Sequence, residues 1–364
     1  MIWRDIRKLD TIILLCVACI FSIGLLFLYS AVHSFPEDYS RSIVTKQMIW
    51  MALGMLIALI FIILDYRKFV DMAYVFYGIS VLALIFVLFA GERRLGAQRW
   101  IQIGAFGFQP SEAIKIAFIL AMSSFIGRRK DDISNPVNIV GAMLLLGVPF
   151  VLIAAQPDLG TALVLIPVFI ALLYIGGMSV KPLMAFIACG IMGTPLFWHM
   201  LKDYQRKRLL VFVNPDLDPM GAGYTIIQSK IAIGSGRIMG KGWLSGTQGQ
   251  LNFLPERHTD FIFSVVGEEW GLVGGLVLLS LYFVVIYRGI RIIGMTSDMY
   301  GKLIATGAVS LLAFQVIVNI GMTLGLLPVV GLTLPFISYG GSSLISSAVA
   351  VALLLNVGLR RPLF

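Results

Sequence analysis

The feature that most limits how this chain folds is a series of long apolar segments along its whole length. A helix needs about 20 predominantly apolar residues to cross the hydrocarbon core of a bilayer. Hydrophobic residues make up 59% of the 364 residues and charged residues only 13%, about half the share found in soluble domains. Soluble, disordered and fibrous proteins are thereby excluded, and the lack of alternating ten-residue segments excludes an outer-membrane barrel. The sequence predicts an all-α polytopic membrane protein.

The apolar segments predict about ten transmembrane helices. The first follows three basic residues, as in a signal peptide, but its length of about 22 residues exceeds the roughly 7–15 of a signal sequence, so we expect an uncleaved span. The tripeptide Gln156-Pro157-Asp158 separates the fifth and sixth spans and predicts a tight hairpin. The expected spans are 11–32, 48–64, 69–90, 111–126, 137–154, 159–175, 182–201, 262–287, 303–325 and 341–358.

The distribution of Lys and Arg predicts that both termini lie in the cytoplasm, because short cytoplasmic loops are enriched in these residues. In this orientation the short external loops contain only Arg41 and Lys46, whereas the short cytoplasmic loops and tails contain 14 basic residues. The net charge of +9 then reflects topology and does not indicate nucleic-acid binding. The 14 residues are Arg4, Arg7, Lys8, Arg67, Lys68, Arg128, Arg129, Lys130, Lys181, Arg288, Arg291, Lys302, Arg360 and Arg361.

Two longer external segments, 91–110 and 202–261, also contain basic residues, which topology does not explain because long loops are translocated regardless of charge. They form either a solvated face or a site for an anionic ligand. Residues 224–233 predict a short amphipathic helix on the membrane surface. We expect one domain, 1–364, with 202–261 as a large external loop. The basic residues of these segments are Arg93, Arg94, Arg99, Lys202, Arg206, Lys207, Arg208, Lys230, Arg237, Lys241 and Arg257.

Asp260 is the most informative single residue, because it lies where a polar loop meets the apolar eighth span. A partly desolvated carboxylate has a raised pKa, which suits a proton acceptor. The alternative is that Thr259 or Asp260 caps the following helix, an arrangement that the helix dipole favours. The residue types alone leave both interpretations open.

Other ionisable residues inside or beside the spans are functional candidates, because charge within a membrane is costly. Glu112 and Lys115 share one helix face at i, i+3 and either bind a ligand or neutralise each other. Asp158 is either functional or a turn residue after proline. Glu268 and Glu269 either serve function or form interhelical hydrogen bonds. No residues have the spacing of metal ligands, so the sequence leaves any metal site unknown.

Several short motifs occur in order along the chain. They are Gly96-Ala97-Gln98-Arg99-Trp100, Phe108-Gln109-Pro110-Ser111-Glu112 with Lys115, Gln156-Pro157-Asp158-Leu159-Gly160, Asp203-Tyr204-Gln205-Arg206, Ile227-Gln228-Ser229, Gly240-Lys241-Gly242, 254–263, Leu327-Pro328 and Ser338-Tyr339-Gly340-Gly341-Ser342. In number and order they resemble the SEDS family (shape, elongation, division and sporulation) of ten-helix peptidoglycan polymerases, over essentially the whole chain. Segments 242–248 and 256–260 are closer to its RodA branch than to its FtsW branch. Lys46 departs from the pattern, since relatives often carry arginine, whose bidentate geometry lysine lacks.

The resemblance implies a glycosyltransferase that polymerises lipid II into β-1,4-linked glycan strands at the outer face of the bacterial cytoplasmic membrane, for cell elongation and rod shape. The 4-hydroxyl of the acceptor GlcNAc attacks the anomeric carbon of a lipid-linked MurNAc with inversion, and undecaprenyl pyrophosphate leaves. Such a displacement needs a base, for which Asp260 is the candidate, and cations at the leaving group. Candidates for the pyrophosphates are Arg99, Lys115, Arg206 and Lys241. The full set of expected substrate-binding residues is Lys46, Arg99, Glu112, Lys115, Asp158, Gln205, Arg206, Lys241, Glu256 and Thr259.

The resemblance also implies a divalent cation, Mg²⁺ or Mn²⁺, that shares the stabilisation of the pyrophosphate, and no organic cofactor. It implies a class B penicillin-binding protein as transpeptidase partner, beside other membrane proteins of the elongation complex, and an apolar cavity between helices for the prenyl chains. The competing hypothesis is a lipid II flippase, and a third is a scaffold that only activates a partner. The external position of the motifs favours the polymerase, as does the lack of internal repeats typical of transporters.

Overall fold

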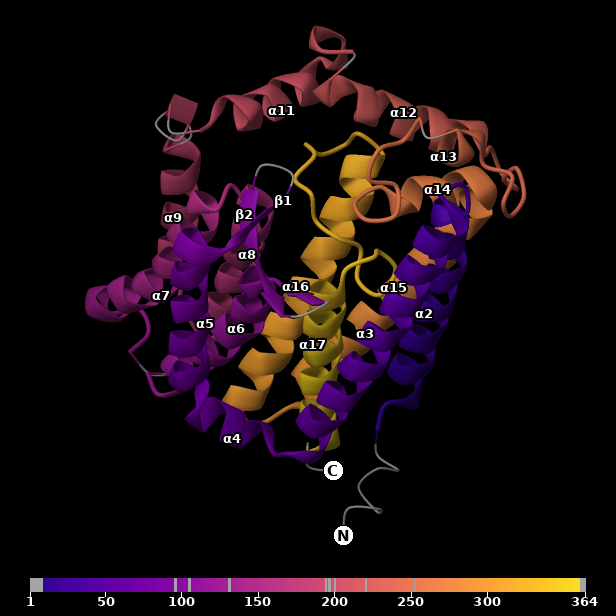
Figure 1. The fold of residues 1–364 in the computed structure, drawn as a ribbon. Helices are drawn as coiled ribbons and strands as arrows, with labels where there is room; N and C mark the ends of the chain where they lie inside the picture. The colour runs from indigo at the N-terminus through magenta and orange to yellow at the C-terminus, as the bar shows by residue number, and fades with distance from the viewer. Residues whose placement is uncertain are drawn as a thin grey trace.

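The computed structural model describes residues 9–94, 97–103, 106–129, 132–193, 195, 198–199, 201–219, 221–251 and 253–360. Within them the chain forms a helical bundle, and an arch of short helices covers the end of the bundle opposite the first turn of the N-terminal span and the last turn of the C-terminal span (Figure 1). The orientation argument also used Arg4, Arg7, Lys8, Lys130 and Arg361, which lie outside the described residues, as do the side chains of Arg93 and Arg94.

Most of the expected spans are present as long apolar helices. Two further helices, α8 (Leu159–Ile175) and α9 (Val180–Met192), are apolar but shorter, and they occupy the positions of the expected sixth and seventh spans. The helical membrane fold is therefore confirmed, while the count of ten spans stays a prediction. In the described part of the chain, the eight helices long and apolar enough to cross a membrane are α2 (Thr11–Val32), α3 (Glu37–Ile63), α5 (Ala73–Ala90), α6 (Pro110–Gly127), α7 (Pro136–Ala155), α15 (Gly271–Met295), α16 (Met299–Thr323) and α17 (Gly341–Leu359).

Three helices, α6, α16 and α17, form the centre of the bundle, and most of their residues are buried. In the other long helices only a minority of the residues is buried, as expected where a bundle faces lipid. Close packing at the centre depends on small residues. A Cβ atom at Gly341 of α17 would lie 2.2 Å from the ring of Trp50 on α3, so the contact between these two helices requires glycine.

The expected eighth span, 262–287, is wrong in its boundaries. Residues Ile262–Glu269 form α14, a separate short helix, and α15 begins at Gly271 and continues to Met295. Gly271 has φ +63, a conformation that favours glycine, and a Cβ there would lie 2.4 Å from the backbone nitrogen of Gly240. The break therefore arises because a distant loop packs directly against the backbone at this point.

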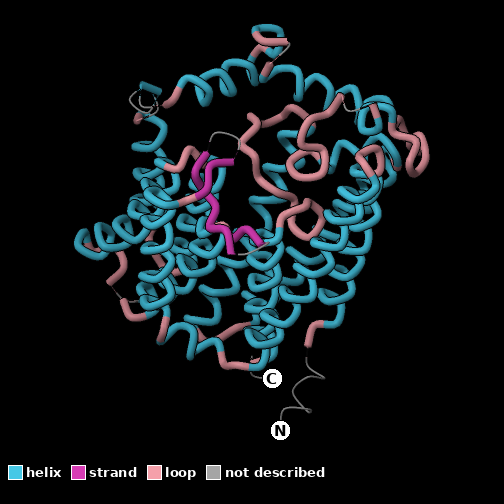
Figure 2. Tube along the Cα trace, in the orientation of Figure 1, coloured by secondary structure: helices cyan, strands magenta, loops and turns pink. Residues whose placement is uncertain are grey.

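A small antiparallel sheet was not expected from the sequence. Strands β1 (Glu92–Arg94), β2 (Ala97–Ile103) and β3 (Phe106–Phe108) pair in the order β1-β2-β3 within the segment expected only to be an external loop. Figure 2 shows the sheet below the arch, in front of the central helices. The apolar pattern does not reveal the register of these strands, in which Glu92 lies opposite Trp100 and Ile101 lies opposite Phe108.

The arch consists of α11 (Asp203–Val213), a single 3-10 turn (Pro215–Leu217), α12 (Ala222–Ser235) and α13 (Thr247–Gln250). Helix α12 includes the residues 224–233, so the predicted short helix is confirmed. The segment 202–261 is therefore a largely helical cover over the bundle (Figure 1). At the opposite end, the short helix α4 (Tyr66–Asp71) connects α3 to α5.

The predicted orientation places the arch outside the cell and the connection between α8 and α9 inside. In a chain whose three native cysteines are replaced by serine, an impermeant maleimide should label Asp216→Cys, in the arch, in intact cells. The same reagent should label Lys181→Cys, at the start of α9, only after the cells are permeabilised. Both side chains are exposed. Labelling in the reverse pattern would show that the orientation is wrong.

Candidate functional site

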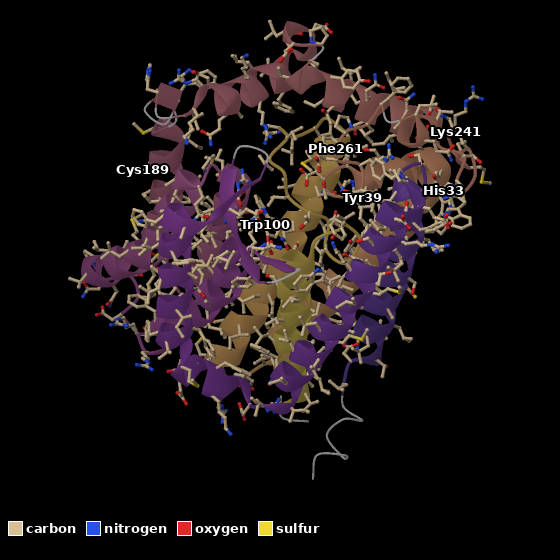
Figure 3. All side chains as sticks on the ribbon, viewed as in Figure 1. His33, Tyr39, Trp100, Cys189, Lys241 and Phe261 are labelled. Atoms are coloured by element: carbon tan, nitrogen blue, oxygen red, sulfur yellow. The ribbon has the colours of Figure 1, made fainter. Side chains whose placement is uncertain are left out.

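A cavity of about 330 Å³ lies between β2, the first turns of α6 and α8, helix α11 and two loops. One loop, residues 253–261, precedes α14 and is called the Asp260 loop; the other, residues 324–340, connects α16 to α17 and is called the Pro328 loop. Figure 3 labels Trp100 of β2, which lines this polar cavity, and Phe261, which follows Asp260; both lie below the arch. The charged residues of the lining are Arg99, Glu112, Asp158, Arg208, Glu256 and Asp260.

Asp260 combines partial burial with a concentration of charge around it. Burial, together with the nearby Glu256 carboxylate, raises the pKa of its carboxyl to about 6, while Arg208 acts in the opposite direction. A carboxylate with this pKa is ionised at neutral pH and is a better proton acceptor than an exposed aspartate. The Asp260 side chain is therefore suited to remove a proton from a group bound in the cavity.

The capping alternative for Thr259 and Asp260 is wrong. Helix α14 begins at Ile262 with Phe261 as its N-cap, and no side chain caps it. The Thr259 hydroxyl instead donates to the main-chain and side-chain oxygens of Glu256, both at 3.1 Å. Glu256 itself has φ +49, a left-handed conformation that is uncommon for a residue other than glycine. Hydrogen bonds within the loop therefore stabilise its turn at Glu256, and the Asp260 side chain lines the cavity instead of capping a helix.

The position of the Asp260 loop depends on Asn319, a fully buried residue of α16. Its amide nitrogen donates to the main-chain oxygen of Asp260 at 2.9 Å and to that of Leu332, in the Pro328 loop, at 2.6 Å. One side chain therefore ties both loops of the cavity to a central helix. The sequence analysis missed Asn319, although an asparagine within an apolar span is a signal that could have identified it.

Two further contacts join the loops. The Ser338 hydroxyl donates to the main-chain oxygen of Thr259 at 2.5 Å, and the backbone nitrogen of Tyr339 donates to the main-chain oxygen of His258 at 2.9 Å. Gln47 of α3 then holds the Pro328 loop, because its amide donates to the Ser338 carbonyl at 3.2 Å. The neighbouring Lys46, an expected substrate-binding residue, does not line the cavity.

Asp158 has the structural role expected of a turn residue and also lines the cavity. It is the N-cap of α8, accepting from the backbone nitrogen of Thr161, and it accepts from the Gln109 amide at 3.2 Å. The Arg99 guanidinium lies 3.5 Å from its carboxylate and also donates to the carbonyl of Pro157 at 2.5 Å. The tight turn between α7 and α8 thus fixes the orientation of Arg99.

Glu112 and Lys115, both expected to bind substrate, form the ion pair on α6 that was the alternative interpretation. The Lys115 nitrogen lies 2.6 Å from a Glu112 carboxylate oxygen, and the two side chains are 1% and 7% exposed. Glu112 lines the polar cavity, but Lys115 lies behind it and does not. The pair therefore contributes a carboxylate to the cavity wall together with a buried counter-charge.

Two other expected residues lie away from the cavity. Arg206 donates to the carbonyls of Trp198 and His199, at 3.0 and 2.8 Å. Lys241 lies 2.7 Å from the buried Glu268 carboxylate. The adjacent Glu269 accepts from the Ser30 hydroxyl on α2, which confirms the interhelical hydrogen bonding considered for this pair. Gln205, Glu256 and Thr259 line the cavity as expected.

Arg208 and Gln109 are site residues that the sequence analysis did not single out. Arg208 was one of several basic residues of the external segments, and nothing in its neighbours distinguishes it from Lys207. Helical spacing on α11 carries Arg208 to the cavity wall beside Leu209 and Gln205. Gln109 was part of a motif, but its two contacts, with Asp158 and with the Ser342 hydroxyl, involve distant helices.

The residues described by the structure offer no protein cage for a metal ion, because no three His, Cys, Asp or Glu side chains among them lie close enough together. The carboxylates of the cavity wall can supply one or two oxygen ligands. Mg²⁺ is commonly held in this way, by one or two carboxylates and the phosphates of a substrate. The donor set therefore fits a metal ion that arrives with a phosphate ligand.

Comparisons with known proteins agree in one family. The model of the FtsW, RodA and SpoVE family, described as "Cell cycle protein", matches residues 10–361. Peptidoglycan glycosyltransferase MrdB of Escherichia coli K12 is 43% identical over 314 residues, covering 85% of this chain and 84% of that protein. Peptidoglycan glycosyltransferase RodA of Treponema pallidum is 33% identical, covering 98% and 99%.

Two solved structures are similar over nearly the whole chain. One belongs to a peptidoglycan synthase complex described as coordinating polymerization and crosslinking; it is 33% identical, with a TM-score of 0.82, and covers 96% of this chain and 97% of that chain. The other is the rod shape determining protein RodA of Thermus thermophilus, 30% identical, with a TM-score of 0.73 and 97% of each chain covered.

The Glu112–Lys115 pair is expected to matter for stability. Lys115→Met leaves the Glu112 carboxylate buried without its counter-charge, which should cost about 3–5 kcal/mol of unfolding free energy. The double variant Glu112→Gln/Lys115→Met should unfold at a higher temperature than Lys115→Met in detergent, because no unpaired charge remains. As a control, Glu37→Gln breaks an ion pair whose side chains are both 76% exposed, and should change stability by about 1 kcal/mol or less. An unchanged melting temperature for Lys115→Met would contradict this role.

Proposed function

Because this chain belongs to the FtsW, RodA and SpoVE family, we infer that it is a peptidoglycan glycosyltransferase of the bacterial inner membrane. The family model spans nearly the whole chain, and relatives that carry this activity in their names are 43% and 33% identical. The mechanism rests on one observation: the Asp260 carboxylate has a raised pKa and lines a charged cavity at the end of the bundle that the arch covers.

We propose that Asp260 is the general base of strand polymerisation from lipid II. The 4-hydroxyl of the acceptor sugar gives its proton to the Asp260 carboxylate while its oxygen bonds to the anomeric carbon of the donor. The bond from that carbon to the pyrophosphate oxygen breaks with inversion, and the electron pair leaves with undecaprenyl pyrophosphate. A pyrophosphate leaves as an anion, so the site needs positive charge at the leaving group and no second acid.

Arg99 and Arg208 are the cations that support this step, because both lie in the cavity wall. Arg99 is oriented by Asp158 and by the carbonyl of Pro157, so its position is set before the substrate binds. The geometry supports these two arginines over Lys115, Arg206 and Lys241, whose side chains are engaged elsewhere.

The lipid part of the substrate needs an apolar environment next to the polar cavity. An apolar groove of about 200 Å³ lies between α3, α5, α6 and α17, and three phenylalanines, Phe61, Phe76 and Phe108, line it. Glu112 and Ser342 belong to both walls, so the groove and the polar cavity adjoin. We propose that the groove holds the prenyl chain while the sugars and pyrophosphate occupy the cavity.

A divalent cation is proposed to share the leaving-group charge. Glu256 and Asp158, which flank Asp260 in the cavity wall, are the carboxylates that would hold Mg²⁺ or Mn²⁺ together with the pyrophosphate. Such an ion would neutralise charge on the departing phosphate oxygens. The residues of this chain then bind the sugars, orient them and accept the proton.

We also propose a class B penicillin-binding protein as the partner that crosslinks the new strands. The support is the similarity to a structure from a synthase complex in which polymerization and crosslinking are coordinated. The similarity to RodA proteins supports a role in cell elongation.

Replacing Asp260 by asparagine tests the base directly. Asp260→Asn keeps the size of the side chain and the main-chain bond to Asn319 but cannot accept the proton, so polymerisation of lipid II should fall by about 10²–10⁴-fold. The measurement is strand synthesis by purified, folded protein. Asp203→Asn, which changes a 96% exposed carboxylate in the arch, serves as the control and should retain activity. Near wild-type synthesis by Asp260→Asn would contradict the assignment of Asp260 as the general base and would favour the lipid II flippase hypothesis.

The pH dependence should follow the charges around Asp260. A base must be ionised, so the rate should fall as pH decreases through about 6. Arg208→Gln removes a charge that lowers the pKa of Asp260 and should move this limb to higher pH, whereas Glu256→Gln removes a charge that raises it and should move the limb to lower pH. Initial rates measured across both sides of pH 6 give the apparent pKa of each variant. Shifts in the same direction for both variants would contradict the electrostatic assignment.

A further inference from the structure

A second groove lies at the end of the bundle opposite the arch, far from the polar cavity along α6. It has a volume of about 410 Å³ and is formed by the first turns of α5, the last turn of α6 and the middle of α7. Its floor is aromatic and aliphatic, and its rim carries arginine. Neither the polymerisation chemistry nor the packing of the central helices accounts for it.

The walls of this groove face outward. Leu144 and Val148 of α7 are 62% and 41% exposed, and Tyr74 of α5 is 39% exposed. At a membrane-spanning helix such exposed apolar side chains contact lipid. The Tyr77 hydroxyl donates to the carbonyl of Leu145 at 2.8 Å, which ties α5 to α7 and fixes the width of the groove. The groove is therefore open to the acyl chains of the bilayer.

Two arginines lie at the rim, and each is held against an aromatic ring. The Arg129 guanidinium lies 4.2 Å from the centre of the Phe125 ring, and that of Arg128 lies 5.7 Å from the centre of the Tyr74 ring. Gly141 makes room for the first of these rings, because a Cβ atom there would lie 2.8 Å from Phe125. The guanidinium groups are thus positioned at the edge of an apolar surface.

Neither arginine has a carboxylate within 4 Å among the residues that the structure describes. Asp132 is the first carboxylate after Arg129 that the structure describes, and it accepts from the amides of Asn135 and Asn138 instead. Three other basic side chains at this end differ in this respect: Arg67 lies 3.9 Å from Asp298, Arg288 pairs with Asp10 at 2.6 Å and Arg360 with Asp65 at 3.4 Å. Within the described part of the chain, two cations without a carboxylate partner therefore border a lipid-facing groove.

We propose that this groove is a binding site for an anionic phospholipid of the inner leaflet. The phosphate lies between the Arg128 and Arg129 guanidinium groups, and one acyl chain runs along Leu144 and Val148. Basic pockets between transmembrane helices on the cytoplasmic side bind acidic lipid head groups by this combination of charge and apolar surface. A zwitterionic lipid supplies the same acyl chain but adds a positive charge next to the arginines, so it binds less well.

The test is a lipid titration of the full chain in detergent, followed by native mass spectrometry, with phosphatidylglycerol and phosphatidylethanolamine of the same acyl chains as probes. The wild type should retain phosphatidylglycerol in preference. Arg128→Gln/Arg129→Gln should weaken phosphatidylglycerol binding by roughly 30-fold, from about 1 kcal/mol for each basic residue. Arg291→Gln/Lys302→Gln removes the same charge at the same end of the bundle on α15 and α16, and should leave binding unchanged.

A second variant tests the apolar half and keeps both arginines. Val148→Trp fills the groove and should also weaken phosphatidylglycerol binding, even if the double arginine variant fails to fold. Inorganic phosphate in excess should not displace the lipid. Equal losses from both charge-neutralising variants would show a general surface-charge effect and overturn the proposal. Equal binding of the two lipids by the wild type, or unchanged binding by Val148→Trp, would also overturn it.

Discussion

The cavity depends on the buried amide of Asn319. The Asp260 loop and the Pro328 loop have little regular structure, and each carries main-chain carbonyls into the interior. A buried carbonyl without a donor is costly, and Asn319 supplies donors to one carbonyl from each loop. Since α16 is central and mostly buried, this pair of bonds gives two irregular loops the rigidity of a packed helix. The Asp260 carboxylate is positioned by that arrangement.

The fold brings a polar cavity and an apolar groove next to each other. Glu112 belongs to both, and its charge is compensated from behind by Lys115 within α6. This arrangement matches a substrate with a charged head and a long lipid tail, because each part finds its own environment without leaving the membrane. It also explains why a helix at the centre of the bundle contains two charged residues despite their cost in an apolar environment.

The cavity has more acids than bases, although its proposed substrate carries phosphates. Four carboxylates and two arginines line it. Asp158 also orients Arg99 and caps α8, so part of its role is structural. Glu256 and Arg208 act in opposite directions on the pKa of Asp260, and the resulting pKa of about 6 is close to neutral pH. The excess of carboxylates over arginines in the wall is the reason to expect a divalent cation between Glu256, Asp158 and the pyrophosphate.

Several properties were predictable from the sequence because they depend on local composition. The length of apolar segments defined the helices, since the bilayer requires it, and Asp260 was identifiable from its position between a polar loop and an apolar span. The resemblance in motifs identified the family. Other properties depend on residues far apart in the chain. Gln47 and Ser338, 291 residues apart, help to shape the cavity, and the break before Gly271 exists because the Gly240 backbone packs against it. Only the tertiary structure decided that Arg208 and Asn319 belong to the site and Lys241 does not, because helical packing and loop contacts, and not residue type, determine which side chain reaches the cavity.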